Sequence, residues 1–304
     1  MPFIPLPISQ AEVEYEYGPD SSPRAGVPSG SLEELTIESD ARFPGTSRKI
    51  WIHTPFGHSS SAESAVMFFN DGWWYLDPTA AVRGAAVLDN LAAEGALPPM
   101  VGVFVDPGIL RVNDAVIKHR NVEYDAFTDD YAGFLLEEVM PLVESRFVVS
   151  RDPMMRGICG GSSGGNAAMT AAWMRPDGIG RVLAFNSSFA QMPGGNPYPA
   201  LLASEPRRST RIFLHAAHRD VNWNQATDNW FAENLETAAA LARAAYDFRL
   251  VVGEGGHSPN HGGTLLPDAL RWLWAEAANW AITMRPKSAT VSRQTRQRQY
   301  GDVA

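Results

Sequence analysis

Residues 155–173, MRGICGGSSGGNAAMTAAW, contain the pattern that decides the fold. A short apolar run ending at Cys159 leads into glycines and serines, and an Ala-rich stretch follows at once. The apolar run is typical of a buried strand, and the Ala-rich stretch is typical of a helix. This part of the chain therefore predicts a buried strand that turns sharply into a helix.

The same succession of strand and helix extends in both directions from this stretch. Short apolar runs predict further buried strands over residues 64–72, 100–108, 181–188, 211–220 and 246–257. Helical patterns cover residues 85–95, 130–147, 166–177, 231–246 and 266–280. Before them, residues 31–39 and 47–55 alternate apolar and polar side chains, which predicts two antiparallel strands around a turn. The regular alternation predicts an α/β fold with a mostly parallel central sheet and helices on both faces.

Composition excludes several classes of protein. The 304 residues are 45% hydrophobic and 19% charged, which is the balance of a globular protein rather than a disordered one. A single cysteine excludes a disulfide framework and a cysteine-cluster metal site. The formal net charge is −9 although five basic residues lie in the last twenty, so we expect the body of the protein to repel nucleic acid.

The sequence shows neither the pattern of a membrane helix nor that of an export signal. No apolar run reaches the roughly 18 residues that a membrane helix needs, and the N-terminus lacks the basic and apolar regions of an export signal. We therefore expect a cytoplasmic protein that acts on a small molecule, without membrane or nucleic-acid partners. A homodimer is left open.

The spacing Gly160-x-Ser162-x-Gly164 is the pattern of a nucleophile elbow. Such a turn is tight, so it needs small residues around the serine, and it leaves the serine at a helix N-terminus that favours a developing oxyanion. The overlapping spacing around Ser163 is the alternative. We favour Ser162 because it leaves a Gly-Gly pair at the strand–helix contact and makes Ser163 an oxyanion donor. A P-loop is excluded because no Gly-Lys-Ser/Thr follows.

A base and an acid are expected at the ends of later strands, because function collects at the carboxyl ends of parallel strands. We favour His257, which directly follows the last strand, over His261 as the base. Asp220 ends the preceding strand and would hold the imidazole tautomer; Asp228 is the alternative. Pro259 and its neighbouring glycines argue against a helix here, and so against a histidine metal pair. The chain order Ser, Asp, His fits an α/β-hydrolase.

Further site residues are expected in the loops at the same sheet edge. Gly72 or Trp73 follows an early buried strand and is the expected second oxyanion donor, beside Ser163. Aromatic side chains of these loops, Trp74 and Trp223 among them, are candidates for binding the substrate. His261 is a further candidate to line the pocket. Neither a metal nor an organic cofactor is expected.

With these residues identified, the chain resembles the esterase branch of the α/β-hydrolases that includes enterochelin esterases, feruloyl esterases and mycolyltransferases. The resemblance covers most of Ser31 to Glu276 and is strongest in three blocks, residues 120–141, 159–189 and 253–274. It implies a serine hydrolase with Ser162 as nucleophile and His257 as base. The segment with Arg120 and Glu123 resembles a family loop that borders the active site, so both residues are expected to bind substrate.

Two departures from the family pattern bear on this interpretation. Related esterases tend to have Asn or Asp directly before the serine, where this chain has Gly161. Siderophore esterases often carry an N-terminal binding domain, and the roughly forty residues before the predicted catalytic fold are too few, so hydrolysis of ferric enterobactin is not favoured.

The expected organisation is an N-terminal arm over residues 1–30, one α/β-hydrolase catalytic domain over residues 31–284, and a polar tail over residues 285–304 that is disordered or serves in an interaction. The expected activity is hydrolysis of a carboxylic ester of a small or medium-sized molecule through an acyl-enzyme. An acyltransferase or lactonase with the same triad is the alternative enzyme. A non-catalytic binding protein on a hydrolase scaffold is the alternative from another class.

Overall fold

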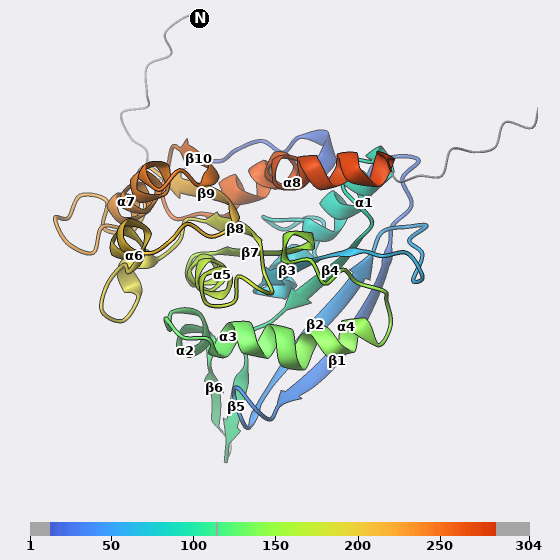
Figure 1. Cartoon of the computed structure of the whole chain (residues 1–304), viewed down its shortest axis with the longest axis horizontal. Coiled ribbons are helices and arrows are strands. Elements are labelled where there is room, and N and C mark those ends of the chain that lie inside the picture. Colours follow the sequence, from blue (N-terminus) through green and yellow to red (C-terminus); the bar gives the residue numbers. More distant parts are fainter. Residues whose placement is uncertain (1–12, 114, 284–304) are drawn as a thin grey trace, which may run out of the picture.

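A ten-stranded sheet runs through the centre of the computed structural model, which describes residues 13–113 and 115–283 (Figure 1). Its strands are β1 (Ser31–Ser39), β2 (Thr46–Thr54), β3 (Ala65–Asn70), β4 (Met100–Val105), β5 (Ile109–Val112), β6 (Ala115–Lys118), β7 (Arg156–Gly161), β8 (Arg181–Phe185), β9 (Arg211–Ala217) and β10 (Asp247–Gly253). The predicted tail, residues 285–304, and the first twelve residues of the predicted arm lie outside the described residues.

Helices connect most of these strands. They are α1 (Gly84–Glu94), α2 (Arg120–Tyr124), α3 (Asp130–Gly133), α4 (Met140–Glu144), α5 (Ser163–Met174), α6 (Tyr198–Ser204), α7 (Trp230–Arg243) and α8 (Pro259–Thr283). A π-helical segment, η3 (Phe134–Val139), joins α3 to α4, and short 3₁₀ turns complete the set at η1 (Pro19–Ser21), η2 (Gly72–Tyr75), η4 (Pro153–Met155) and η5 (Phe189–Gln191). None of the helices in the described ranges is long and apolar enough to cross a membrane.

The strand order confirms the predicted mostly parallel sheet. Strands β4, β3, β7, β8, β9 and β10 are parallel neighbours in that order. Strand β2 pairs antiparallel with β4 and with β1, and the β1–β2 register joins Ser39 to Thr46 as the predicted hairpin requires. Strand β7, which leads to the predicted nucleophile, lies between β3 and β8, so loops from both sides reach its end.

Both faces of the sheet are covered by helices, because the central strands are apolar on both sides. On β4, Val101, Val103 and Val105 belong to the same apolar cluster as residues of α5, α6, α7 and the continuous α3–η3–α4 helix. Met100 and Phe104, whose side chains alternate with these, pack instead with α1 and α8. Figure 1 shows α1 and α8 together on one side of the sheet and α3, α4 and α5 on the other. Full burial of each large apolar side chain contributes about 1.5–3 kcal/mol to the stability of the folded protein.

Several elements differ from the sequence prediction. The β5–β6 hairpin extends from the sheet beyond β2, and most of its residues are exposed, so it lacks the apolar pattern that marks a buried strand. Helix α6 was not predicted, because its seven residues are too few to reveal a helical period. Helix α8 begins at Pro259 rather than Leu266, which corrects the expectation that Pro259 excludes a helix. Proline is well tolerated in a first helical turn, where no amide needs an intrahelical acceptor.

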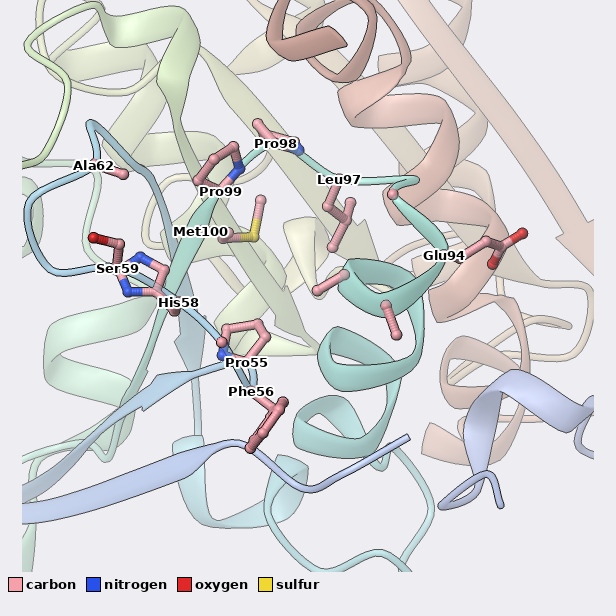
Figure 2. A pocket seen from close by; sticks show the side chains of 14 residues that line it. Pro55, Phe56, His58, Ser59, Ala62, Glu94, Leu97, Pro98, Pro99 and Met100 are labelled. Atoms are coloured by element: carbon pink, nitrogen blue, oxygen red, sulfur yellow. The ribbon is translucent and has the colours of Figure 1, made fainter. Parts of the chain in front are cut away.

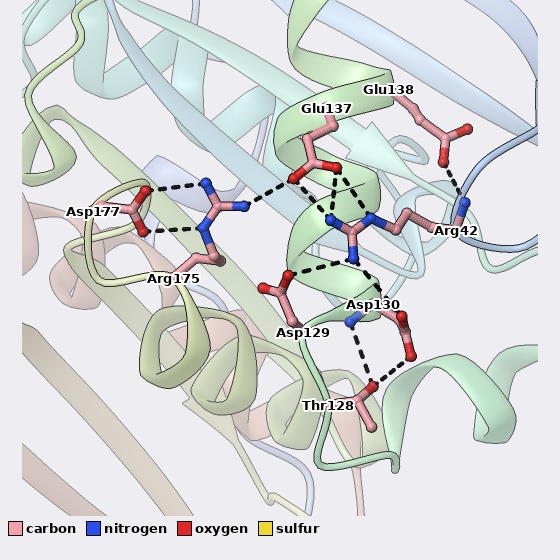
Figure 3. A network of polar contacts seen from close by, with 8 residues as sticks. All are labelled: Arg42, Thr128, Asp129, Asp130, Glu137, Glu138, Arg175 and Asp177. Carbon is pink, nitrogen blue, oxygen red and sulfur yellow. Dashed lines mark hydrogen bonds and ion pairs between the residues drawn. The ribbon is translucent and has the colours of Figure 1, made fainter.

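An exposed network of ion pairs ties the β1–β2 turn to the helical layer (Figure 3). Arg42, from the turn, contacts Glu137 of η3 at 2.7 Å and also reaches Asp129. Glu137 in turn accepts from Arg175 at the end of α5, and the Arg42 hydrogen bonds lower the pKa of this carboxyl group. Because these groups are partly exposed to water, we expect each ion pair to contribute little to the stability of the fold. The network then serves mainly to align the β1–β2 turn with the helical layer.

A buried ion pair ties β2 to α2. The Arg48 guanidinium lies 2.6 Å from the Glu123 carboxylate, and neither side chain is exposed. Glu123 also accepts from the amide of Gly108, and Arg48 stacks on the ring of Phe134 at 4.0 Å. The pair therefore fixes helix α2, and with it Arg120, relative to the sheet.

We predict that Glu123→Gln destabilises the protein by about 3–5 kcal/mol, because it leaves the Arg48 charge buried without a counterion. Glu33→Gln is the matched control, since Glu33 pairs with Arg146 at 3.0 Å on the exposed surface, and it should cost less than about 1 kcal/mol. Urea unfolding of the three proteins measures both values. Equal losses in the two variants would contradict a structural role for the buried pair.

Candidate active site

Ser162 occupies the turn between β7 and α5, with a backbone φ of 59° and ψ of −130°. Few non-glycine residues adopt such angles, and the conformation costs on the order of 1–3 kcal/mol. The turn closes tightly, because a Cβ on Gly160 would overlap the carbonyl oxygen of Gly164. At Gly161, by contrast, an added Cβ meets its nearest atom at 3.5 Å, an ordinary contact. The departure from the family pattern at Gly161 therefore leaves the turn geometry intact.

Ser162 and Ser163 lie in different surroundings. Ser162 is half-buried and lines a cavity of about 130 Å³. Ser163 is buried, and its hydroxyl lies 3.4 Å from both the Asn121 amide and the Ser188 hydroxyl. In the described residues the Ser163 backbone amide has no acceptor. Ser162 is therefore the more accessible hydroxyl, and Ser163 offers a free amide beside it.

His257 lines the same cavity and is paired with Asp220. Nδ1 of His257 lies 2.7 Å from Oδ1 of Asp220, and among the described residues Nε2 of the imidazole has no hydrogen-bond partner. The Asp220 side chain is fully buried and also accepts from the amide of Val221, whereas His257 is about one-third exposed and lines the cavity with Ser162. Trp230 packs edge-on against the imidazole at 4.9 Å. Asp228, the alternative acid, is exposed on the surface.

The loop after β3 lies over the turn that carries Ser162. Asp71 has a left-handed backbone, with φ of 57°, and its buried carboxylate accepts two hydrogen bonds from Arg120, at 2.6 and 2.8 Å. Arg120 also donates to the carbonyl of Gly161. Asn70 donates to the carbonyl of Gly164 at 2.8 Å. These contacts hold the backbone at Gly72 against the start of α5.

Of the two residues expected to complete an oxyanion hole, only Gly72 has a free amide in the described part of the chain. The amide of Trp73 donates to Asp106 at 3.0 Å, which corrects the expectation that Trp73 is a donor. No local sequence pattern indicates this bond, because Asp106 directly follows β4, the neighbouring strand. Burial raises the pKa of Asp106 to about 6.

Among the residues expected to bind substrate, Trp74 and Arg120 line the cavity with Ser162. Glu123 does not, since its carboxylate is buried in the pair with Arg48. Trp223 is exposed and stacks with Arg219 at 4.6 Å, away from the cavity lining. Glu123 and Trp223 therefore lie outside this cavity lining, and their role in binding substrate stays a prediction.

His261 is a buried partner of another histidine rather than part of the cavity. Its Nδ1 lies 2.7 Å from Nε2 of His215, a residue of β9 with no exposed surface. Burial lowers the pKa of His261 to about 4. Burial and the neighbouring histidines lower the pKa of His215 to about 3, so both rings are neutral near pH 7. His261 lies outside the lining of the cavity with Ser162, and a contact with substrate stays a prediction.

Sequence reasoning missed some of the cavity lining. Phe185, Asn186, Ser258 and Pro259 complete the wall around Ser162. Asn186 donates to the carbonyl of Ser258 at 3.3 Å and so joins the end of β8 to the loop that carries His257. Phe185 and Asn186 end a predicted strand, so the rule that strand ends carry function could have identified them.

A larger cavity of about 690 Å³ lies at the opposite end of the sheet, where β4 begins (Figure 2). Its wall is formed by the segment after β2 and the end of α1, and it consists largely of proline, alanine and other apolar residues. His58, one of its few polar groups, is already hydrogen-bonded to Ser64 at 2.9 Å. Ser64 is buried, its hydroxyl also donates to the carbonyl of Ala62, and it does not line this cavity, so the hydroxyl paired with His58 does not face it.

Groups that could bind a metal were also sought. Within residues 13–113 and 115–283, no three His, Cys, Asp or Glu side chains form a cluster that could hold a metal ion. The one cysteine, Cys159, is buried beside Tyr75, and burial raises its pKa to about 12.

Two curated proteins that the chain resembles both carry the word esterase in their names. The chain is 27% identical over 245 residues to an iron(III) enterobactin esterase of Dickeya dadantii, covering 74% of this chain and 51% of that protein. It is 24% identical over 165 residues to an endo-1,4-beta-xylanase/feruloyl esterase of Xylanibacter ruminicola, covering 52% of this chain and 22% of that protein. The chain thus spans about half the length, or less, of these curated relatives.

Solved structures of low sequence identity share the fold. The enterobactin esterase of Shigella flexneri aligns with a TM-score of 0.67 and 22% identity, over 90% of this chain and 65% of that one. A ferulic acid esterase from Anaeromyces mucronatus aligns with a TM-score of 0.66 and 19% identity, over 88% and 97% of the two chains. Their common architecture supports the α/β-hydrolase type of fold.

The family assignment rests on a broader match than any single relative. The model of the family described as "Putative esterase" matches residues 41–291, which include every strand from β3 to β10 and the whole site around Ser162. Because this match covers well over half of the chain, the protein belongs to the Putative esterase family.

Proposed function

We propose that the protein is a serine esterase, with Ser162 as nucleophile, His257 as general base and Asp220 as the acid that orients the base. One observation carries the proposal: the half-buried Ser162 shares a cavity with an imidazole whose other nitrogen is bound to a buried carboxylate. That is the relationship of nucleophile, base and orienting group that acyl transfer uses.

In the first half of the reaction, Oγ of Ser162 attacks the carbonyl carbon of the ester while Nε2 of His257 takes the hydroxyl proton. The Asp220 carboxylate keeps the imidazole in the tautomer with Nδ1 protonated and stabilises the imidazolium. The tetrahedral oxyanion accepts hydrogen bonds from the amides of Ser163 and Gly72, which have no other acceptor in the described residues. Collapse breaks the bond to the alcohol, and His257 protonates the leaving alkoxide.

In the second half, a water molecule attacks the acyl-enzyme. His257 removes a proton from the water, and the same two amides again stabilise the oxyanion. Breakage of the bond to Oγ releases the carboxylic acid, and the proton returns from His257 to Ser162. The cycle therefore consumes one water molecule and uses the side chains and backbone amides named above.

The cavity suggests a small ester. Its volume of about 130 Å³ and its wall of Trp74, Phe185 and Pro259 favour an apolar or aromatic group of modest size. Arg120 also lines it, but its guanidinium is already paired with Asp71, so we assign it to holding the Gly72 loop as well as bordering the substrate. Relatives named for enterobactin or feruloyl esters support an ester of this general kind.

We predict that Ser162→Ala lowers the rate of p-nitrophenyl acetate hydrolysis by at least about a thousandfold, because it removes the nucleophile. Ser163→Ala is the matched control, since it keeps the backbone amide and removes only a buried hydroxyl. Its rate should stay within about tenfold of wild type. Circular dichroism verifies that both variants are folded.

The outcome that contradicts this assignment is a loss confined to Ser163→Ala, or full activity in both variants. A series of p-nitrophenyl acetate, butyrate and octanoate tests the cavity in the same assay. The two shorter esters should be hydrolysed faster, because the octanoyl chain exceeds the enclosed space.

We predict that Asp220→Asn lowers kcat by about a thousandfold or more, because a neutral amide can neither fix the tautomer nor stabilise the imidazolium. Asp228→Asn changes an exposed aspartate eight residues away and should leave kcat within about twofold of wild type. Steady-state kinetics on p-nitrophenyl butyrate measures both. If the two variants lost activity equally, or only Asp228→Asn did, Asp220 would not be the acid.

A further inference from the structure

The N-terminal arm runs along the loop that carries His257. Residues 13–17, VEYEY, alternate inward and outward, with Val13, Tyr15 and Tyr17 half-buried and the two glutamates exposed. A Cβ on Gly255, just before His257, would lie 3.1 Å from the Cβ of Val13. The arm thus lies against this loop although more than two hundred residues separate the two in sequence.

Tyr15 contacts the loop on both sides of His257. Before the histidine, the Tyr15 hydroxyl accepts from the amide of Glu254 at 2.6 Å and donates to its carbonyl at 3.2 Å. After it, the backbone amide of Tyr15 donates to the Asn260 side chain at 2.6 Å, and Asn260 returns a bond to the Tyr15 carbonyl at 3.1 Å. Both ends of the segment from Glu254 to Asn260 are therefore attached to one residue.

The Tyr15 ring adds a third contact. It stacks on His261 with ring centroids 3.7 Å apart and an angle of 4° between the planes. His261 is itself held by the hydrogen bond to His215 in the sheet, and a Cβ on Gly253 would overlap its ring. The arm is thus docked onto a rigid part of the fold, the end of β10 and the first turn of α8.

The composition of the Glu254–Asn260 loop explains why the contacts with Tyr15 matter. It contains Gly255, with a φ of 90°, and Gly256, and glycines give a chain the greatest conformational freedom to lose. Besides the His257–Asp220 pair, Arg219 donates its amide to the Gly255 carbonyl and Asn186 bonds the Ser258 carbonyl at 3.3 Å. Removal of the Tyr15 bonds would leave the backbone before and after the base with fewer constraints.

We propose that Tyr15 is a positioning residue for the reaction, which holds the Glu254–Asn260 loop so that the His257 imidazole stays aligned between Asp220 and Ser162. The inference rests on the proposed function of His257. Tyr15 acts through this loop and is not itself part of the cavity lining. A base displaced by even about 1 Å can lower a rate a hundredfold, so loss of the support should reduce kcat.

The test compares Tyr15→Phe, Tyr15→Ala and Tyr17→Phe in the full chain, with p-nitrophenyl butyrate as the probe. Tyr15→Phe removes the hydroxyl bonds to Glu254 but retains the ring on His261. We expect kcat to fall about tenfold in Tyr15→Phe and about a hundredfold in Tyr15→Ala, with KM within about twofold of wild type.

Tyr17→Phe is the matched control. It removes a hydroxyl from the same arm whose bond, at 2.8 Å, goes to the carbonyl of Ala81 rather than to the loop. Its kcat and KM should remain within about twofold of wild type. Thermal unfolding curves identify any variant that is not folded at the assay temperature; if Tyr15→Ala is not, the two phenylalanine variants decide the result.

Equal kcat values in Tyr15→Phe and Tyr17→Phe would overturn the inference, as would a change confined to KM. These results differ from a failure of the proposed function. In that case the wild-type protein would hydrolyse no ester of the series, or Ser162→Ala would remain active, and the arm variants would have no reaction to modify.

Discussion

The strained backbone at Ser162 is the constraint on which the rest of the site depends. A non-glycine residue with a φ of 59° and a ψ of −130° is stable only if the surrounding structure holds it there. The close approach of Gly160 to Gly164 brings α5 directly onto the end of β7. Packing of that Ala-rich helix against the sheet supplies the favourable free energy that offsets the strain, and the serine hydroxyl is left facing the cavity.

The position of β7 in the middle of the sheet explains how the other groups reach this serine. Its neighbours are β3 and β8, and β9 and β10 follow on the β8 side. The parallel strands all end at the same edge, so the loop with Gly72, the Asp220 turn and the His257 loop converge there. Two ionic contacts then fix the loop after β3: the buried pair of Arg48 with Glu123 holds α2, and the partly exposed Arg120 on α2 holds Asp71.

Much of this arrangement could be predicted because it follows from local pattern. The alternation of apolar strands and helices identified the fold, and the polar residues at strand ends identified Ser162, Asp220 and His257 as candidates. Roles that depend on long-range contacts could not be predicted in the same way. Among the described residues the amide of Gly72 has no acceptor, whereas the amide of Trp73 is bound by Asp106, which directly follows another strand, β4. Burial of Glu123 and of His261 likewise depends on partners distant in sequence.

The central claim, that Ser162 rather than Ser163 is the nucleophile, is tested most directly by covalent labelling. The protein would be treated with a fluorophosphonate, digested, and the peptide containing both serines fragmented in a mass spectrometer. The account predicts the adduct on Ser162, with labelling reduced at least about a hundredfold in His257→Ala because the base no longer activates the hydroxyl. An adduct on Ser163, or no adduct in the folded wild-type protein, would contradict it.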